Sequence, residues 1–161
     1  AKAQRALARV LVDMGRFDQA AATLEELIEK IPTHYAGRLE LAVVYQQLER
    51  PDAAEHQYRI AIQQAPDQLK GYTQLAALLG SHSKWLEAAE VLSQAVERFP
   101  QEPDAWFNLG TAYLFAGRYQ ESVAALQRAV ELNPNDQVAV DQLARAMEAS
   151  GELSEPEATR Q

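Results

Sequence analysis

The sequence of 161 residues has no cysteine, which excludes disulfide bonds, thiolate metal sites and thiol nucleophiles. Cations are also in the minority, with 15 Lys and Arg against 23 Asp and Glu and a formal net charge of −8. A nucleic-acid binder needs clustered cations to displace counterions from phosphates. We therefore expect no nucleic-acid partner, and the same balance argues against binding to an anionic membrane surface.

Long apolar runs are missing as well. None approaches the roughly 18 consecutive apolar residues that a membrane span requires, so we expect a soluble protein without membrane insertion. No signal peptide is visible, and the composition leaves cytoplasm and periplasm both open. The chain begins at Ala1 without methionine and its helical pattern starts at once, which predicts that it is a piece of a longer protein.

Residues that carry enzyme chemistry are few and scattered. His34, His56 and His82 occupy three different places in the repeating pattern described below, so stacking of identical units would not gather them. No HxxxH or carboxylate–histidine spacing offers metal chelation, and no glycine-rich phosphate loop is present. We expect no catalytic residue, no cofactor and no metal site, and hence a chain that is not an enzyme.

The sequence does contain a helical hairpin over residues 103–134. Apolar residues recur at spacings of three and four on either side of a break at Gly117. The first half carries the pattern W-x-x-L-G-x-x-Y from Trp106 to Tyr113. Small residues, Gly110 and Ser122, stand where the two helices must approach. The segment is therefore predicted to be two amphipathic helices folded on each other.

The hairpin recurs along the whole chain. Pro32, Pro66, Pro100 and Pro134 close successive units and lie 34 residues apart. The predicted helix-crossing positions are all small: Ala8, Ala42, Ala76, Gly110 and Ala144 in first helices, and Ala20, Ala54, Ala88 and Ser122 in second helices. The frame predicts one array over 1–161, with repeats 1–34, 35–68, 69–102 and 103–136, a capping helix over about 137–150 and a tail over 151–161.

Two joints of this array differ from the rest. The third repeat turns at Gly80–Ser83, a looser joint, and we expect its first helix to end early. The final helix places Val140, Leu143, Ala144 and Met147 on one side, which predicts a lid over the last hairpin. No equivalent lid is visible at the N-terminal end, which again predicts that further repeats or another domain precede Ala1.

The pattern resembles the tetratricopeptide repeat over the whole chain. In the fourth repeat it departs by having Ser122 where Ala is usual and Leu126 where Phe is usual. The resemblance implies an all-α fold, a right-handed α-solenoid of helix-turn-helix repeats with a C-terminal capping helix. It also implies a non-enzymatic scaffold for protein–protein interaction, whose concave groove binds a partner peptide or helix.

The resemblance implies which residues line that groove. Repeat positions 4, 7, 8 and 11 form the packing stripe of each first helix, and the face opposite is left over. The groove residues expected on it are Arg5, Arg9, Leu39, Val43, Lys70, Gln74, Phe107, Asn108, Thr111 and Phe115. Of these, Leu39, Val43, Phe107 and Phe115 are expected to supply affinity, because exposed apolar and aromatic groups dominate binding, and Asn108 to hydrogen-bond a peptide backbone.

A negative prediction follows for one class of partner. Chaperone adaptors that this chain resembles bind acidic C-terminal tails at positions that match Arg5, Arg9, Glu40, Lys70 and Gln74. Glu40 places a carboxylate where those adaptors have an amide. We therefore predict that no such tail is bound.

Two other functions stay open on the sequence. The chain is a candidate self-association module that forms homo-oligomers through open solenoid ends. It is equally a candidate recruiting or regulatory arm of a larger multidomain enzyme.

Overall fold

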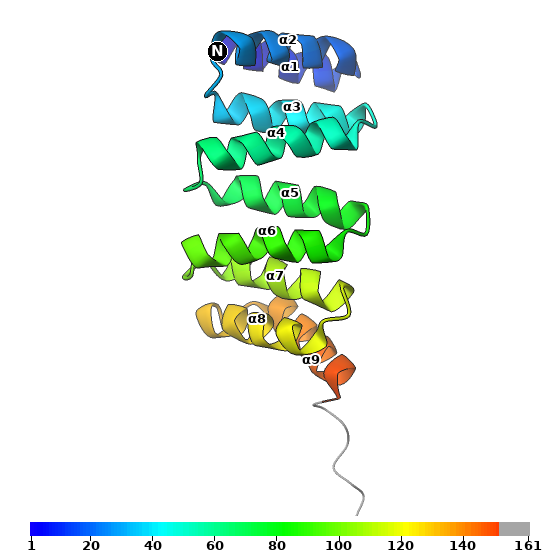
Figure 1. Ribbon diagram of the computed structural model, residues 1–161, viewed down its shortest axis with the longest axis vertical. Coiled ribbons are helices and arrows are strands. Elements are labelled where there is room, and N and C mark those ends of the chain that lie inside the picture. The colour runs from blue at the N-terminus through cyan, green and yellow to red at the C-terminus, as the bar shows by residue number, and fades with distance from the viewer. Residues whose placement is uncertain (152–161) are drawn as a thin grey trace, which may run out of the picture. The chain divides into compact units, whose positions relative to one another are not determined.

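The structure is a computed structural model that describes residues 1–151, in which all regular structure is helical. The nine described helices are joined by short turns (Figure 1). In chain order they are α1 (Lys2–Asp13), α2 (Phe17–Lys30), α3 (Tyr35–Gln47), α4 (Pro51–Gln64), α5 (Leu69–Ser81), α6 (Trp85–Arg98), α7 (Pro103–Phe115), α8 (Tyr119–Leu132) and α9 (Gln137–Ser150). We call α1, α3, α5, α7 and α9 first helices and the others second helices. The chain forms two compact units, and the second begins at Leu79, inside α5.

The turns between paired helices share one backbone conformation. Each turn contains one residue with a left-handed backbone conformation. The N–H group of the next residue donates to the carbonyl group five residues earlier in the chain. This pattern satisfies carbonyl groups at the end of a helix that would otherwise lack a hydrogen bond. The left-handed residues are Gly15 (φ 71°), Glu49 (φ 56°), Ser83 (φ 60°) and Gly117 (φ 74°). The closing hydrogen bonds are 2.8 to 2.9 Å long: Arg16 to Leu11, Arg50 to Tyr45, Lys84 to Leu79 and Arg118 to Tyr113.

The expectation that α5 ends early is wrong. This helix has 13 residues, as α3 and α7 do. Ser83 adopts the left-handed conformation although it is not glycine, so the third turn has the geometry of the others. Gly80 lies within α5 and makes a close contact instead, since a Cβ there would lie 2.4 Å from the Trp85 ring.

The prolines that close the repeats are hydrogen-bonded to the helices that follow them. The Trp106 indole N–H donates to the Pro100 carbonyl at 3.0 Å, and the Tyr72 hydroxyl to the Pro66 carbonyl at 3.3 Å. Arg38 donates to the Pro32 carbonyl at 2.7 and 3.1 Å. These three donors share repeat position 4, and each ties the start of a first helix to the turn before it. Burial also lowers the pKa of the Arg38 guanidinium.

The first unit has a core between hairpins as well as within them. Helix α2 contacts both α1 and α3. The core residues are Ala8, Leu11, Ala20, Ala21, Leu24, Leu27, Leu41 and Val44. Repeat positions 7 and 10, here Leu41 and Val44, therefore pack on the preceding second helix. Helical periodicity predicts one packing stripe on each first helix, whereas α3 has two buried faces because it lies between the second helices α2 and α4.

The second unit confirms the tight crossing of α7 and α8. Ser122 is fully buried, and its hydroxyl donates to the Gly110 carbonyl at 2.7 Å. A Cβ added at Gly110 would lie 2.5 Å from Leu126 Cγ. Both small residues are thus required by the close approach of the two helices.

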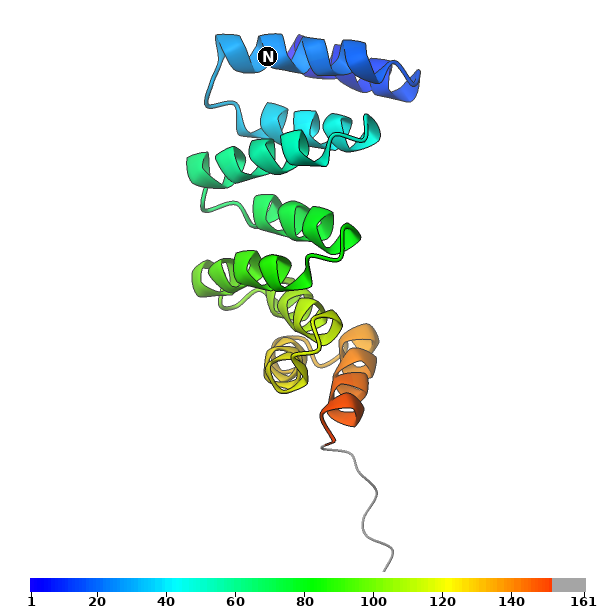
Figure 2. The same cartoon turned by 45° about the vertical axis from the view of Figure 1, so that its right-hand side comes forward.

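Helix α9 covers the residues predicted for it and packs on α8 (Figure 2). The Asp136 carboxylate caps the first turn of α9 by accepting hydrogen bonds from the backbone N–H groups of Val138 and Ala139, at 3.0 and 3.2 Å. Leu143 and Met147 pack on a core cluster formed by Val123 and Leu126 of α8 and Ala146 of α9. Its fully buried residues, however, are Ala139 and Ala146. The predicted tail, apart from Gly151, lies outside the described residues.

Candidate functional site

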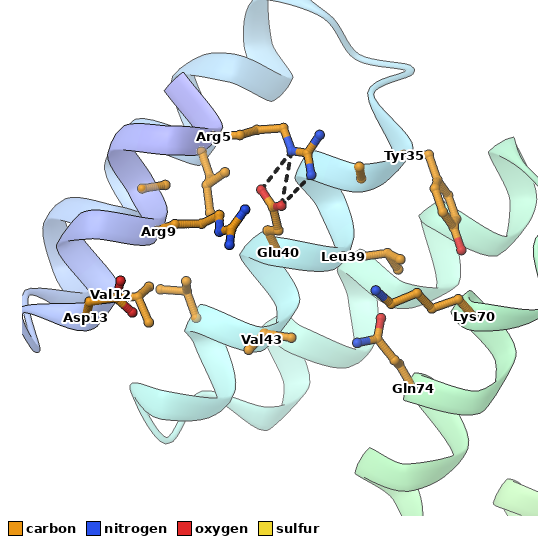
Figure 3. Close-up of a pocket in the computed structure, with 14 residues that line it drawn as sticks. Arg5, Arg9, Val12, Asp13, Tyr35, Leu39, Glu40, Val43, Lys70 and Gln74 are labelled. Carbon is orange, nitrogen blue, oxygen red and sulfur yellow. Dashed lines mark hydrogen bonds and ion pairs between the residues drawn. The ribbon is translucent and has the colours of Figure 1, made fainter. Parts of the chain in front are cut away.

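A cleft in the first unit crosses the first helices α1, α3 and α5 and has a volume of about 460 Å³ (Figure 3). Six of the ten predicted groove residues line it: Arg5, Arg9, Leu39, Val43, Lys70 and Gln74. The remaining lining residues are Ala8, Val12, Asp13, Leu24, Tyr35, Ala36, Glu40 and Val44. Residues at the same repeat positions come together because successive first helices are stacked side by side within the unit.

The apolar lining comes from α1 and α3. Val43 is 37% exposed, and Val12 is half-buried on the opposite wall. Leu39 is only 5% exposed, so it forms part of the wall rather than a projecting contact. An apolar side chain of a bound molecule would therefore meet Val12 and Val43 first.

One ion pair crosses the cleft. The Arg5 guanidinium makes three hydrogen bonds to the Glu40 carboxylate through two nitrogens: its single Nε–H is shared between the two carboxylate oxygens at 3.0 and 3.1 Å, and Nη2 donates to Oε1 at 2.6 Å (Figure 3). The hydrogen bond to Glu40 raises the pKa of Arg5 above its ordinary value. The pair connects α1 to α3 and is electrically neutral as a unit.

Two other cations reach the cleft from opposite sides. Arg9 projects from α1 and Lys70 from α5, and both are exposed (Figure 3). Neither forms an ion pair with a residue that the structure describes. Glu40 neutralises the charge of Arg5, whereas the charges of Arg9 and Lys70 stay available to an anionic group in the cleft.

Gln74 contributes a buried polar atom to the same wall. Its side-chain oxygen is buried and makes no hydrogen bond with any described residue. A buried polar group without a partner is costly. Either end of an amide pairs with a peptide backbone group, since it can donate or accept. Because the oxygen itself is buried, a peptide backbone in the cleft pairs with the amide N–H groups of Gln74 unless the side chain turns.

The other four predicted groove residues lie in the second unit, on α7. Phe107 packs against the core cluster of Val123, Leu126 and Ala146, which gives it a structural role. Asn108 is half-buried, and the Thr111 hydroxyl is buried without a hydrogen-bond partner among the described residues. Phe115 is 59% exposed, and its ring stacks on Trp85 with a centroid distance of 4.6 Å.

Sequence reasoning missed this stacked aromatic pair. Trp85 follows one interhelix turn and Phe115 precedes the next, so the pair joins α6 to α7, and both rings line an open pocket of about 380 Å³. The two residues are 30 positions apart, and only the repeat frame could have indicated their contact. Phe115 is thus partly covered by Trp85 rather than projecting alone.

Signs of other chemistry are absent from the part of the chain that is described. Residues 1–151 contain no cluster of three or more His, Asp or Glu side chains suited to a metal ion. None of the helices within this range is long and apolar enough to cross a membrane.

A sequence model of the tetratricopeptide repeat matches residues 5–68 and 73–137. The chain belongs to the tetratricopeptide repeat family. The family assignment and the all-α helical repeat fold predicted from the sequence are both confirmed. A comparison with curated protein sequences found no match.

Solved structures of tetratricopeptide repeat proteins share the fold of this chain. A crystal structure of MamA superposes with a TM-score of 0.77 at 18% identity, covering 93% of this chain and 82% of MamA. PilF of Pseudomonas aeruginosa gives 0.72 at 22% identity, covering 94% of this chain and 69% of PilF. YrrB, described as a TPR protein with an unusual peptide-binding site, gives 0.72 at 16% identity, covering 94% and 78%. Identities this low show a shared fold and nothing of the partners.

Proposed function

We propose that this chain is a non-enzymatic protein-interaction module, and that the cleft over α1, α3 and α5 holds an extended segment of a partner protein. The fold belongs to a family whose members generally mediate protein–protein interaction. The observation that carries the proposal is the composition of the cleft. An apolar wall around Val43, two cations that form no ion pair with a described residue and the half-buried side chain of Gln74 line one space.

The dimensions favour an extended segment over a single side chain. Neighbouring packed helices lie roughly 8–10 Å apart, so a path across three first helices covers roughly 20 Å. An extended chain rises about 3.3 Å per residue, and about six residues would cross the cleft. Clefts of about 300–1,000 Å³ are typical of ligand sites, so the volume here suits several side chains of such a segment.

Selection from a random peptide library tests this proposal. The chain should enrich peptides that share a pattern of apolar residues and one acidic residue, and Val43→Arg should abolish their binding by filling the cleft with a charged side chain. Ala22→Arg is the matched control, because Ala22 is exposed on α2 and does not line the cleft. Enrichment of no peptide, or equal loss of binding in both variants, would refute the proposed cleft.

Self-association is a second candidate function, and an exposed stripe on α1 favours it. Leu7, Val10 and Met14 are 52%, 53% and 61% exposed. The equivalents of Leu7 and Val10 in α3 are Leu41 and Val44, which are buried in the core shared with the preceding second helix α2, and the equivalent of Met14 is the half-buried Leu48. Sedimentation over a dilution series tests this candidate. A dimer that dissociates in Leu7→Glu/Val10→Glu but persists in Ala22→Glu supports it, and a monomer at every concentration refutes it.

A recruiting arm of a larger enzyme would use the same cleft. The family's usual lack of catalysis supports a non-enzymatic role for the chain itself. Peptide selection therefore tests the binding surface in both cases: when the chain acts as an independent interaction module, and when it recruits a partner to a fused enzyme domain.

A further inference from the structure

The ion pair between Arg5 and Glu40 lies in the cleft that the proposed function assigns to a partner segment. The guanidinium makes three hydrogen bonds to the carboxylate, the longest at 3.1 Å. Charge-assisted bonds of this kind are the strongest hydrogen bonds that a side chain makes with a carboxylate. Glu40 therefore holds Arg5 as a carboxylate from another molecule would.

The pair faces the cleft and not the protein core. The Arg5 and Glu40 side chains remain 35% and 27% exposed. A partner's carboxylate could reach Arg5 only by displacing Glu40 or by lying beside it. Displacement breaks three hydrogen bonds, and juxtaposed like charges disfavour binding. An acidic group is thus disfavoured at this point of the cleft.

We propose that Glu40 is a specificity-determining residue of the cleft. It occupies Arg5 and converts this part of the cleft from a carboxylate site into a neutral one. This inference rests on the proposed peptide-binding function. It adds that the partner segment is uncharged where it passes Arg5 and Glu40.

The remaining cations define where negative charge is accepted. Arg9 and Lys70 reach the cleft from α1 and α5, on either side of the ion pair (Figure 3). Neither is neutralised by a described acidic residue. The partner class is therefore a mainly apolar segment with a single acidic group directed to Arg9 and Lys70, and not a segment with clustered acidic residues.

Glu40→Gln tests the inference, because it removes the charge and keeps the shape and the hydrogen-bonding oxygen. Asp13→Asn is the matched control. Asp13 also lines the cleft and is exposed, and it makes no ion pair within the described residues. Both variants remove one negative charge from the cleft, but only Glu40→Gln removes the charge that neutralises Arg5.

The probe is the peptide that selection on the unmodified chain yields, with each residue replaced in turn by glutamate. For one or two positions of the peptide, the glutamate-substituted peptide should bind the Glu40→Gln variant at least about tenfold more tightly than it binds the unmodified chain. Asp13→Asn should show a smaller change spread over all positions. Adding Arg5→Gln to Glu40→Gln should remove the gain, because the released cation is then absent.

Several outcomes would overturn the inference. They are no gain at any scanned position, an equal gain with Asp13→Asn, or a gain that survives Arg5→Gln. If Glu40→Gln lowers the melting temperature, a second variant is used, Arg5→Glu/Glu40→Arg, in which the two charges are exchanged and the ion pair is retained. This swapped variant should bind every scanned peptide with the affinity of the unmodified chain. A gain in the swapped variant refutes the inference. These outcomes differ from a failure of the proposed function, in which selection yields no peptide whose binding is lost in the Val43→Arg variant.

Discussion

Replacing Gly110 by alanine tests the packing between α7 and α8 most sharply. In an ordinary helix interior this change stabilises by about 1 kcal/mol, because alanine has the higher helix propensity. Here the added Cβ would lie 2.5 Å from Leu126 Cγ, 3.0 Å from Leu126 Cδ2 and 3.1 Å from the Leu126 backbone nitrogen. A rotamer change can relieve the first two contacts. The third can be relieved only by moving α8.

The expected result is a net loss of stability. Overpacking a core costs about 1–3 kcal/mol, and the backbone contact puts this site at the upper end. After the gain in helix propensity, the free energy of unfolding should fall by about 2 kcal/mol. Unfolding in urea, followed by circular dichroism, measures this change.

Leu126→Ala supplies the control for the mechanism. It should cost about 2–5 kcal/mol by itself, because Leu126 is fully buried. In that background Gly110→Ala should cost less than in the unmodified chain, since the contacts with Leu126 Cγ and Cδ2 are gone and only the 3.1 Å contact with the backbone nitrogen remains. The packing described for this crossing would be refuted if Gly110→Ala raised the free energy of unfolding of the unmodified chain and raised it by the same amount in the Leu126→Ala variant.

Three further predictions concern the repeat turns, the helix register and pH. Glu49→Gly and Ser83→Gly should each stabilise by about 1 kcal/mol because a left-handed conformation is strained for residues with a Cβ, and destabilisation in urea melts would contradict the turn geometry. Ala76 is buried and Ala77 exposed, so Ala76→Leu should cost about 1–3 kcal/mol and Ala77→Leu much less; equal costs would show an incorrect register. Burial raises the pKa of Tyr58 to about 12, and burial with a hydrogen bond to Glu25 raises that of Tyr45 to about 12. Because the unfolded chain ionises these phenols near their ordinary pKa of 10.0, the stabilising contribution is complete below pH 10 and is lost as the pH rises toward 12. Tyr58→Phe should reduce that loss in urea melts, and an unchanged pH dependence would show that Tyr58 is not responsible.

The helical hairpins could be predicted because the 34-residue period repeats without insertion, although the end of α5 could not. Gly117 and Pro51 mark breaks through local backbone preferences that do not depend on the rest of the fold. The turn at Ser83 could not be read in this way. Neither Glu49 nor Ser83 favours a left-handed conformation, and both adopt it because the helices on either side impose the turn.

The site was only partly predictable for a related reason. Helical periodicity placed Arg5, Arg9 and Lys70 on one face, and the structure brings them to one cleft. Periodicity within one helix does not show what a neighbouring hairpin covers. Leu39 was expected as a contact residue and is a buried wall residue, and Phe107 packs on the core cluster of Val123, Leu126 and Ala146. The stacking of Phe115 on Trp85 also depends on the approach of two hairpins.

Methyl NMR of the chain with a selected peptide tests the central claim most directly. Val12, Leu39 and Val43 line the cleft, whereas Leu7 and Val10 lie on the exposed stripe of α1 and Leu86 is exposed on α6. Peptide binding in the cleft should shift the methyl signals of the first three residues at saturation and leave Leu7, Val10 and Leu86 unchanged. Shifts confined to Leu7, Val10 or Leu86, with Val12 and Val43 unmoved, would contradict the proposed cleft.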